Sequence, residues 1–308
     1  MRQEEKMDKN NLNNNGKALT ELGSAKEYSF LQMVFKRFIK HKLAVAGFII
    51  AMTLIILSVF APVFSNGHDP RRADINKRFY LPMTENYILG TDDVGRDEWT
   101  RLLYGGRASL TIGFITAISG AIIGGIIGSI SGYFGKAIDS IIMRIVEIMF
   151  SIPTLPLLIT LARYWGGSMW NIIIILVIFG WAGTARMVRG MVLSIKEYEF
   201  IEASRAIGCS NTRIILRHIF PNTLAILLVT MTLSVGGAIL AESSLSFLGI
   251  GVDPSTPTWG NMLSNAQNFL WNAPHLVIWP GLFIFLTILS FNFLGDGLRD
   301  SLDPKLKV

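Results

Sequence analysis

The stretch EFIEASRAIGCSNTRIILRHIFPN, residues 199–222, is polar and lies between two long apolar runs of the chain. Acidic residues, Glu199 and Glu202, come first, and the basic residues Arg213 and Arg217 follow. A segment with this many charges cannot cross the hydrocarbon of a bilayer by itself. The fold class therefore depends on the apolar runs on either side of it.

The composition of the chain is that of a membrane protein. It has 308 residues, of which 51% are hydrophobic and only 16% are charged, and its mean hydropathy is +0.45. Soluble domains are about a quarter charged. The net charge of +6 does not indicate nucleic-acid binding, because basic residues of membrane proteins flank the spans on the cytoplasmic side. The single cysteine, Cys209, excludes an intramolecular disulfide.

Apolar runs long enough to cross a membrane, about 20 residues each, recur along the chain. The sequence therefore predicts an all-α integral membrane protein with six transmembrane helices. The third predicted span is unusual because it contains Asp139, Arg144 and Glu147. The predicted spans are residues 43–64, 108–134, 138–161, 169–190, 223–241 and 276–294.

The segments between the spans define the predicted orientation. More Lys and Arg lie near the span ends on the side of the N-terminus, which predicts that both termini are cytoplasmic. The first span is too long for a signal peptide and starts too late, so we expect it to be retained. The remaining segments are a disordered polar arm (1–29), an amphipathic interfacial helix (30–42), a folded outer cap (65–107), a cytoplasmic loop (191–221), an outer loop (242–275) and a cytoplasmic tail (295–308).

Within residues 199–222 the pattern predicts two short helices joined by a tight corner. Ile201, Ala206 and Ile207 form the apolar stripe of the first helix, and Gly208 supplies its C-terminal stop. The second helix is capped by Ser210 or Asn211, and Pro221 marks the turn into the fifth span. The apolar face of the second helix consists of Ile214, Ile215 and Ile219.

Glycines recur at every fourth position of the second span. Small residues at this spacing let two helix backbones approach closely in lipid. We therefore expect a tight packing seam with another span or another subunit. The four residues are Gly120, Gly124, Gly128 and Gly132.

The third span combines charges with prolines. Arg144 and Glu147 are three residues apart and therefore share a helix face. They form either a gate or pathway element or a structural ion pair near the cytoplasmic end. Pro153 and Pro156, in SIPTLP (151–156), predict a break in this helix, and broken helices of transporters often line a cavity.

Catalytic, metal-binding and cofactor-binding sites are not expected in this chain. GYFGKA (132–137) lacks the spacing of a phosphate-binding loop. The histidines are scattered over different segments, so neither a metal site nor a general base is indicated. They are His41, His68, His218 and His275.

EASRAIG, followed by IFP, resembles the coupling loop of ATP-binding-cassette importer permeases. In that family the loop docks into a groove on the ATPase subunit. Ser204 replaces a second Ala of the family pattern, and Phe220 replaces a Leu. The matching residues are Glu202, Ala203, Gly208, Ile219 and Pro221. The resemblance implies that Glu202 holds the loop to its partner.

Three further stretches narrow the resemblance to peptide importer permeases of the oligopeptide-permease C type. They are LGTDDVGRDEWTRLLYGGRASL (89–110), ESSLSFLGIGVDPSTPTWG (242–260) and FNFLGDGLRDSLDPK (291–305). Dipeptide and nickel permeases share most of these motifs. Glu147, where Asp is common in the dipeptide branch, favours an oligopeptide cargo.

The resemblance also implies the partners. They are a second homologous permease, two ATPase subunits that bind ATP and Mg, and an extracytoplasmic peptide-binding protein, all assembled in the cell membrane. The chain itself would be a non-enzymatic pore subunit, and the substrate would pass between the two permeases along spans three and five. Three other functions are considered. A secondary transporter would work without ATPase partners and should show internal repeats. A channel-forming or structural membrane protein would not need the two-helix loop, and a membrane enzyme would need clustered catalytic groups.

Overall fold

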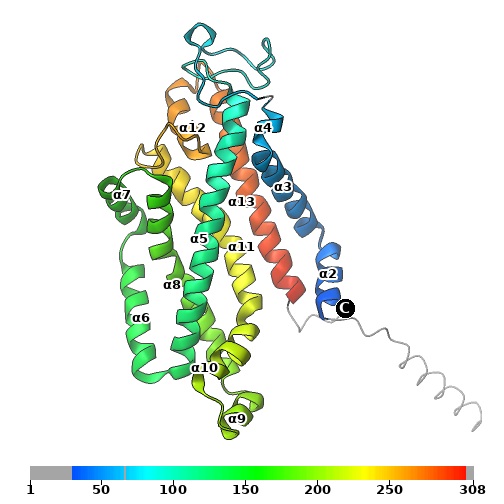
Figure 1. The fold of residues 1–308 in the computed structure, drawn as a ribbon, viewed down its shortest axis with the longest axis vertical. Coiled ribbons are helices and arrows are strands. Elements are labelled where there is room, and N and C mark those ends of the chain that lie inside the picture. Colours follow the sequence, from blue (N-terminus) through cyan, green and yellow to red (C-terminus); the bar gives the residue numbers. More distant parts are fainter. Residues whose placement is uncertain (1–29, 66, 303–308) are drawn as a thin grey trace, which may run out of the picture.

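The computed structural model describes residues 30–65 and 67–302, so the predicted arm at 1–29 lies outside the described residues. Long helices run side by side in one bundle (Figure 1). Five of them are long and apolar enough to cross a membrane, or up to six if one bent pair counts as a single span. The described residues form isolated β-bridges but no strand, which confirms the all-α prediction.

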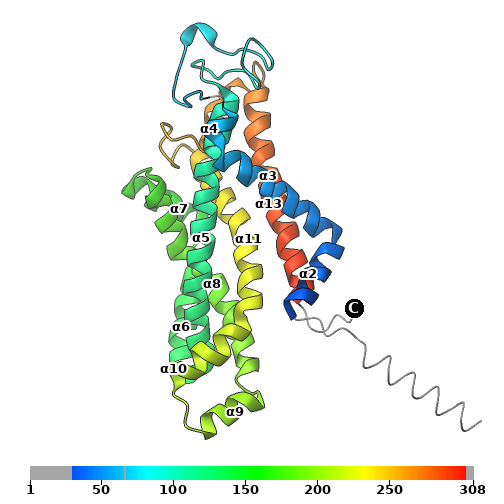
Figure 2. The ribbon, with the colours of Figure 1, turned by 45° about the vertical axis from the view of Figure 1, so that its right-hand side comes forward.

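The helices are α2 (Phe30–Lys40), α3 (Lys42–Val59), α4 (Ala61–Phe64), α5 (Glu98–Phe134), α6 (Lys136–Ser151), α7 (Thr154–Trp165), α8 (Met169–Ile195), α9 (Glu199–Ala206), α10 (Asn211–Ile214), α11 (Phe220–Phe247), α12 (Trp259–Ala266) and α13 (His275–Leu302). A π-helical turn, Ile215–Ile219, joins α10 to α11. Short 3-10 helices cover Ile75–Lys77 and Gln267–Phe269. The bundle has a cap end, with residues 67–97 and α12, and an α9 end, with α9 and α10 (Figures 1 and 2).

Helix α2 is joined to the bundle through the residue that follows it. His41 caps α3, because its Nδ1 accepts a hydrogen bond from the Ala44 N–H at 3.1 Å. Its Nε2 lies 3.4 Å from the Asp300 carboxylate near the end of α13. The outer face of α2 exposes Phe35 and Ile39, as a helix lying on a membrane surface would.

Helices α5 and α8 share the most extensive contact among the described helices. A Cβ atom built on Gly124 would lie 2.7 Å from the Trp181 carbonyl oxygen, and one on Gly128 would lie 2.5 Å from that of Ala185. Gly120 faces the backbone of Gly180, and Gly132 packs on Val192. The predicted glycine seam therefore lies within this chain, against α8.

Several helices extend beyond the predicted spans. Helix α5 begins at Glu98 instead of residue 108, because Asp97 accepts the Trp99 N–H and caps it ten residues before the apolar run. The other extended helices are α8, which ends at Ile195 and not 190, α11, which ends at Phe247 and not 241, and α13, which ends at Leu302 and not 294. Hydropathy marks only the part of a helix that lies in hydrocarbon, so polar extensions escape it.

The third predicted span, 138–161, is not one straight helix. Helices α6 and α7 are separated at Ile152 and Pro153, and their axes differ by 86°. Pro153 and Pro156 both lack an N–H, so the backbone ladder cannot continue through this point. Pro153 precedes α7 as its N-cap residue, with φ −58°. The break predicted from SIPTLP is present.

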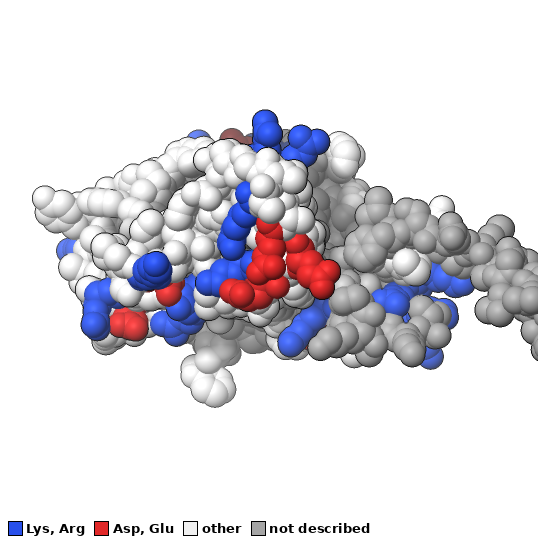
Figure 3. Space-filling view, turned by 90° about the horizontal axis from the view of Figure 1, so that it is seen from below, with Lys and Arg blue, Asp and Glu red and all other residues white. Residues whose placement is uncertain are grey.

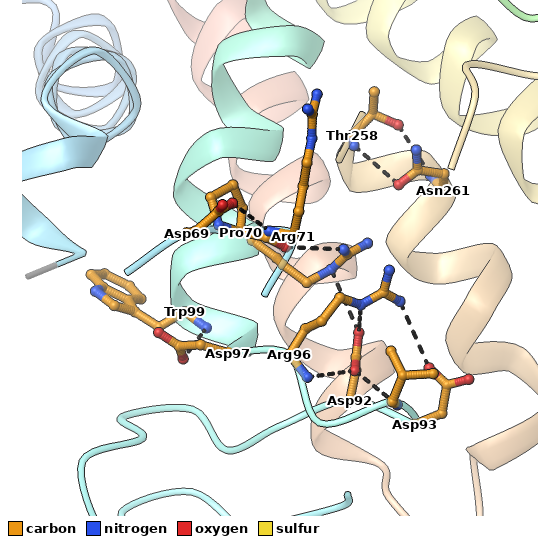
Figure 4. A network of polar contacts seen from close by, with 12 residues as sticks. Asp69, Pro70, Arg71, Asp92, Asp93, Arg96, Asp97, Trp99, Thr258 and Asn261 are labelled. Carbon is orange, nitrogen blue, oxygen red and sulfur yellow. Dashed lines mark hydrogen bonds and ion pairs between the residues drawn. The ribbon is translucent and has the colours of Figure 1, made fainter. Parts of the chain in front are cut away.

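Paired charges order the cap (Figure 4). The Asp92 carboxylate accepts hydrogen bonds from the N–H groups of Val94 and Arg96, and from Arg96 Nε at 2.6 Å. Buried Arg101, from α5, lies 3.7 Å from the same carboxylate and reaches the Pro70 carbonyl at 3.4 Å. The motif at 89–110 thus joins the cap to α5.

Candidate functional site at the α9 end

Helix α9 ends in a Schellman motif. The Cys209 N–H donates to the Ser204 carbonyl, and the Gly208 N–H donates to that of Arg205. Gly208 adopts φ +81°, in the left-handed region that this motif requires at its position. The predicted helix stop at Gly208 is therefore present in the structure.

The faces of α9 differ from the prediction. Ile201 is fully buried, and Ser204, three residues on, is also buried, with its hydroxyl donating to the Phe200 carbonyl at 2.7 Å. Ala206 and Ile207, which were predicted to belong to the apolar stripe with Ile201, are both exposed, Ile207 to 80%. The reason is that Ile207 is the C-cap, where the chain leaves the helix and the periodicity ends.

The second short helix begins as predicted, but it does not end at a turn. Ser210 caps α10, because its hydroxyl accepts the Arg213 N–H. Helix then continues through Ile215–Ile219 into α11, so Pro221 does not mark a turn. The π-turn explains this: the Phe220 N–H donates to Ile215, five residues back, and the widened turn accommodates a proline that has no N–H.

Buried isoleucines attach the α9–α10 segment to the bundle. Ile201, Ile214 and Ile219 are fully buried in one cluster. The cluster includes Val188 and Val192 of α8. Displacing α9 therefore has to displace the ends of the long helices, since packed cores deform little.

The free surface of this end combines acidic, basic and apolar side chains. Glu197, Glu199 and Glu202 are exposed, and acidic side chains gather among basic ones when the bundle is viewed from below (Figure 3). Ala203 is exposed beside them, and so is Ile207, the C-cap residue directly after α9.

Tyr133, which the sequence analysis did not single out, joins both short helices to α5. Its hydroxyl donates to Asn211 Oδ1 at 2.7 Å, and the Arg205 guanidinium lies 5.2 Å from its ring centroid. Tyr133 itself is buried. A buried tyrosine needs a partner for its hydroxyl, but the partner is 78 residues away in the chain and has no mark in the sequence.

The charges of α6 form two separate ion pairs, one to α8 and one within α6. Asp139 binds Arg189 of α8 through both carboxylate oxygens and accepts the Ser131 hydroxyl at 2.6 Å. Arg144 and Glu147 do form an ion pair, 3.2 Å apart, but their side chains are 76% and 58% exposed. The pair is therefore no core element of this chain.

At the cap end, Glu242 is fully buried in α11 and was also missed. Its carboxylate accepts hydrogen bonds from Ser246 at 2.7 Å and from Thr258 at 2.9 Å. Thr258 is the N-cap of α12, so the carboxylate joins α11 to α12. Within residues 30–65 and 67–302, no group of three or more His, Cys, Asp and Glu could hold a metal ion.

Family models match two parts of the chain. Residues 124–308 match the model described as "Binding-protein-dependent transport system inner membrane component". Residues 29–82 match "N-terminal TM domain of oligopeptide transport permease C".

Curated relatives and a solved structure agree with these matches. The chain is 43% identical over 273 residues, 89% of each chain, to a dipeptide transport system permease of Alkalihalophilus pseudofirmus. It is 40% identical to the oligopeptide transport system permease of Bacillus subtilis over 92% of each chain, and 40% identical to a glutathione transport system permease of Escherichia coli over 89% of this chain and 90% of the relative.

An inward-facing structure of the MetNI methionine ABC transporter has the same fold, with a TM-score of 0.54 and 23% identity over 66% of this chain and 96% of that one. The chain belongs to the inner-membrane permeases of binding-protein-dependent transport systems, and it is a permease subunit of a peptide ATP-binding-cassette importer.

Proposed function

We propose that the α9 end is cytoplasmic and that α9, with Glu202, Ala203 and Ile207 on its free face, docks onto an ATPase subunit. The observation that carries the proposal is the contrast between the two sides of α9. Ile201 is fully buried against the bundle, whereas Ile207 is 80% exposed at its tip. An apolar side chain held out at a rigid corner, beside acidic residues, suits a groove with an apolar floor and a basic rim.

The family suggests the remaining subunits of the transporter. ATP and Mg would be bound by two ATPase subunits, a second permease would form the other half of the pathway, and a peptide-binding protein would deliver cargo at the cap end. We propose an oligopeptide cargo. Dipeptides and nickel are the alternatives that the shared motifs leave open.

The mechanism requires that α9 and the long helices move together. The buried cluster of Ile201, Ile214 and Ile219 and the contacts of Tyr133 connect α9 to α5, α8 and α11. Closure of the ATPase pair would shift α9, and the long helices would rock with it. The pathway would then alternate between inward-open and outward-open states, as in other transporters that operate by alternating access.

Co-purification from the native host tests the docking proposal. We expect the tagged chain to bring down ATPase subunits and a second permease. A Glu202→Lys, Gly208→Val variant should lose the ATPases and retain the second permease. Glu85→Lys, a charge reversal in the cap at the opposite end, is the control and should retain the ATPases and the second permease. A variant that keeps its ATPases would refute the docking role, and a wild-type chain that purifies alone would favour a secondary transporter.

A further inference from the structure

A cavity of about 240 Å³ lies between α5, α7, α8 and α11, midway along the bundle. Glycines leave room for it: a Cβ atom on Gly180 or Gly237 would meet no atom within 4 Å. Apolar side chains, among them Leu158 and Phe179, line most of the remaining wall. Among the described residues, none of the side chains that line the cavity is charged.

One wall residue, Thr116 of α5, has an unused polar group. Thr116 is 7% exposed, and in the described part of the chain its hydroxyl oxygen has no hydrogen-bond partner. Two hydroxyls of α11 are satisfied by their own helix: Thr230 donates to Leu227, and Ser234, on the cavity wall, donates to Thr230. Ser129, further along α5, is also buried without a partner among the described residues, but it does not line the cavity. A buried hydroxyl without a partner costs about 1–3 kcal/mol, so an acceptor group that reaches Thr116 from the cavity would be bound favourably.

The start of helix α7 borders the same cavity. It is twelve residues long, and its first residue, Thr154, is on the cavity wall. The first N–H groups of a helix have no partner inside the helix. Pro156 has no N–H, and the Leu157 N–H donates to the Pro153 carbonyl. Within the described ranges, the N–H groups of Thr154 and Leu155 are left without a protein acceptor.

We propose that this cavity is a contact site for the transported peptide, in which the Thr116 hydroxyl and the first N–H groups of α7 donate to a main-chain carbonyl or carboxylate oxygen of the cargo. The proposal rests on the peptide-importer function proposed above. Gly180 and Gly237 leave room for one small, uncharged side chain of the peptide beside that oxygen. The site therefore recognises a main-chain oxygen of the peptide, and it favours a short apolar side chain on the residue that lies beside that oxygen.

The hydrogen-bond donors at the cavity favour a peptide over a lipid as the occupant. A lipid acyl chain could fill an apolar space, but it has no acceptor for Thr116 or for the end of α7. A peptide carbonyl supplies that acceptor, and a helix start favours partial negative charge by its dipole. Half-helices of this kind recur at the substrate sites of transporters.

The test uses the intact complex, co-purified with its partners and reconstituted in proteoliposomes. Uptake of radiolabelled di-, tri- and tetra-alanine is measured together with ATP hydrolysis. Thr116→Val keeps the size of the side chain and removes the donor, and Thr116→Ser restores it. Thr230→Val is the matched control, because that hydroxyl already donates to Leu227.

We expect Thr116→Val to lower kcat/KM for peptide uptake about five- to tenfold, the usual worth of one hydrogen bond. Basal ATP hydrolysis and subunit composition should not change, Thr116→Ser should recover uptake, and Thr230→Val should behave as wild type. Gly237→Leu, which fills the cavity, should reduce uptake of tetra-alanine without loss of assembly.

Three results would overturn the proposal. If Thr116→Val transports as well as Thr230→Val does, the site is not used. If a photoreactive fatty acid labels α5 or α11 at this cavity and excess peptide does not compete, the occupant is lipid. If the second permease cross-links to a cysteine placed at Gly237 in every state, the occupant is a partner side chain. A wild-type complex that accumulates no peptide refutes the cargo class itself, which is a distinct failure.

Discussion

Gly208 sets the corner after α9 by its conformation and not by crowding. A Cβ atom there would meet nothing within 4 Å, but the residue has φ +81°. Gly190 of α8 is equally uncrowded and is helical. The two positions therefore separate the cost of the left-handed conformation from the cost of added volume.

We expect Gly208→Ala to destabilise the α9–α10 segment by about 1–2 kcal/mol, the cost of a left-handed L-residue. Gly190→Ala should be neutral or stabilising by up to about 1 kcal/mol, because alanine favours helix. Hydrogen exchange of residues 199–214 in the two variants gives the comparison. Equal protection in both would mean that positive φ is not what fixes the corner.

The Asp139–Arg189 pair should contribute more than the Arg144–Glu147 pair. Its side chains are 16% and 30% exposed, and it links two helices. Removing one partner of a fully buried pair costs about 3–5 kcal/mol, so about 1–3 kcal/mol is expected at this exposure.

A double-mutant cycle with Asp139→Asn and Arg189→Gln checks this by unfolding in detergent, and the double variant should lose less stability than the two singles added. The same cycle at Arg144 and Glu147 is the control, with an expected coupling of about 0–0.5 kcal/mol. If the two pairs have equal coupling energies, the exposure of their side chains does not determine how much each pair contributes to stability.

Single residues show where a sequence stops being informative. The stop at Gly208 follows from local chemistry, so it could be predicted. The pairing of Asp139 with Arg189 joins residues 50 apart, and no local pattern marks it. Ile207 was placed on the wrong face because a periodic pattern gives no sign that its last member has left the helix.

At the scale of elements, Pro221 and the π-turn before it depend on each other, because the wide turn accommodates a residue that has no N–H. The turn holds one more residue than an α-helix would, and each residue of an α-helix rotates the chain by about 100°. Pro221→Ala restores the missing N–H, so we expect Ile215–Ile219 to relax toward α-helix and to rotate α10 and α9 relative to α11.

Because that rotation would misdirect the free face of α9, ATP hydrolysis in the reconstituted complex should continue with several-fold less peptide transported per ATP. Uptake and phosphate release, measured in the same vesicles, provide this ratio. Ser244→Ala, at the other end of α11, is the control, and it should leave the ratio unchanged. An unaltered ratio in Pro221→Ala would show that the π-turn plays no part in coupling.

Elements were predicted well where apolar length decides and poorly where polar caps decide. The break between α6 and α7 followed from two prolines close together, whose lack of an N–H is a local property. The start of α5 at Glu98 depends on the Asp97 cap inside a polar loop, where hydropathy carries no information. The continuity of α10 with α11 depends on a π-turn, for which the sequence has no reliable mark.

At the scale of the whole molecule, Cys209 is a natural probe of orientation. It is the only cysteine of the chain, it lies at the α9 end, and it is partly exposed. With a cytoplasmic α9 end, an impermeant maleimide should label it in inside-out vesicles and not in intact cells. Met83→Cys, at an 80% exposed cap position, in a Cys209→Ser background, should give the opposite result. Labelling of Cys209 from outside would reverse the proposed topology.

The glycine seam between α5 and α8 also has a consequence for biosynthesis. Helices α5 and α8, which pack against each other along the glycine seam, are separated in the chain by all of α6 and α7. At about 5–20 residues per second, the roughly 60 residues from the end of α5 to the end of α8 take about 3–12 s to translate. During that time α5 must wait in the translocon or in lipid with its glycine face uncovered, so the ribosome, and not helix packing, sets when this seam can close.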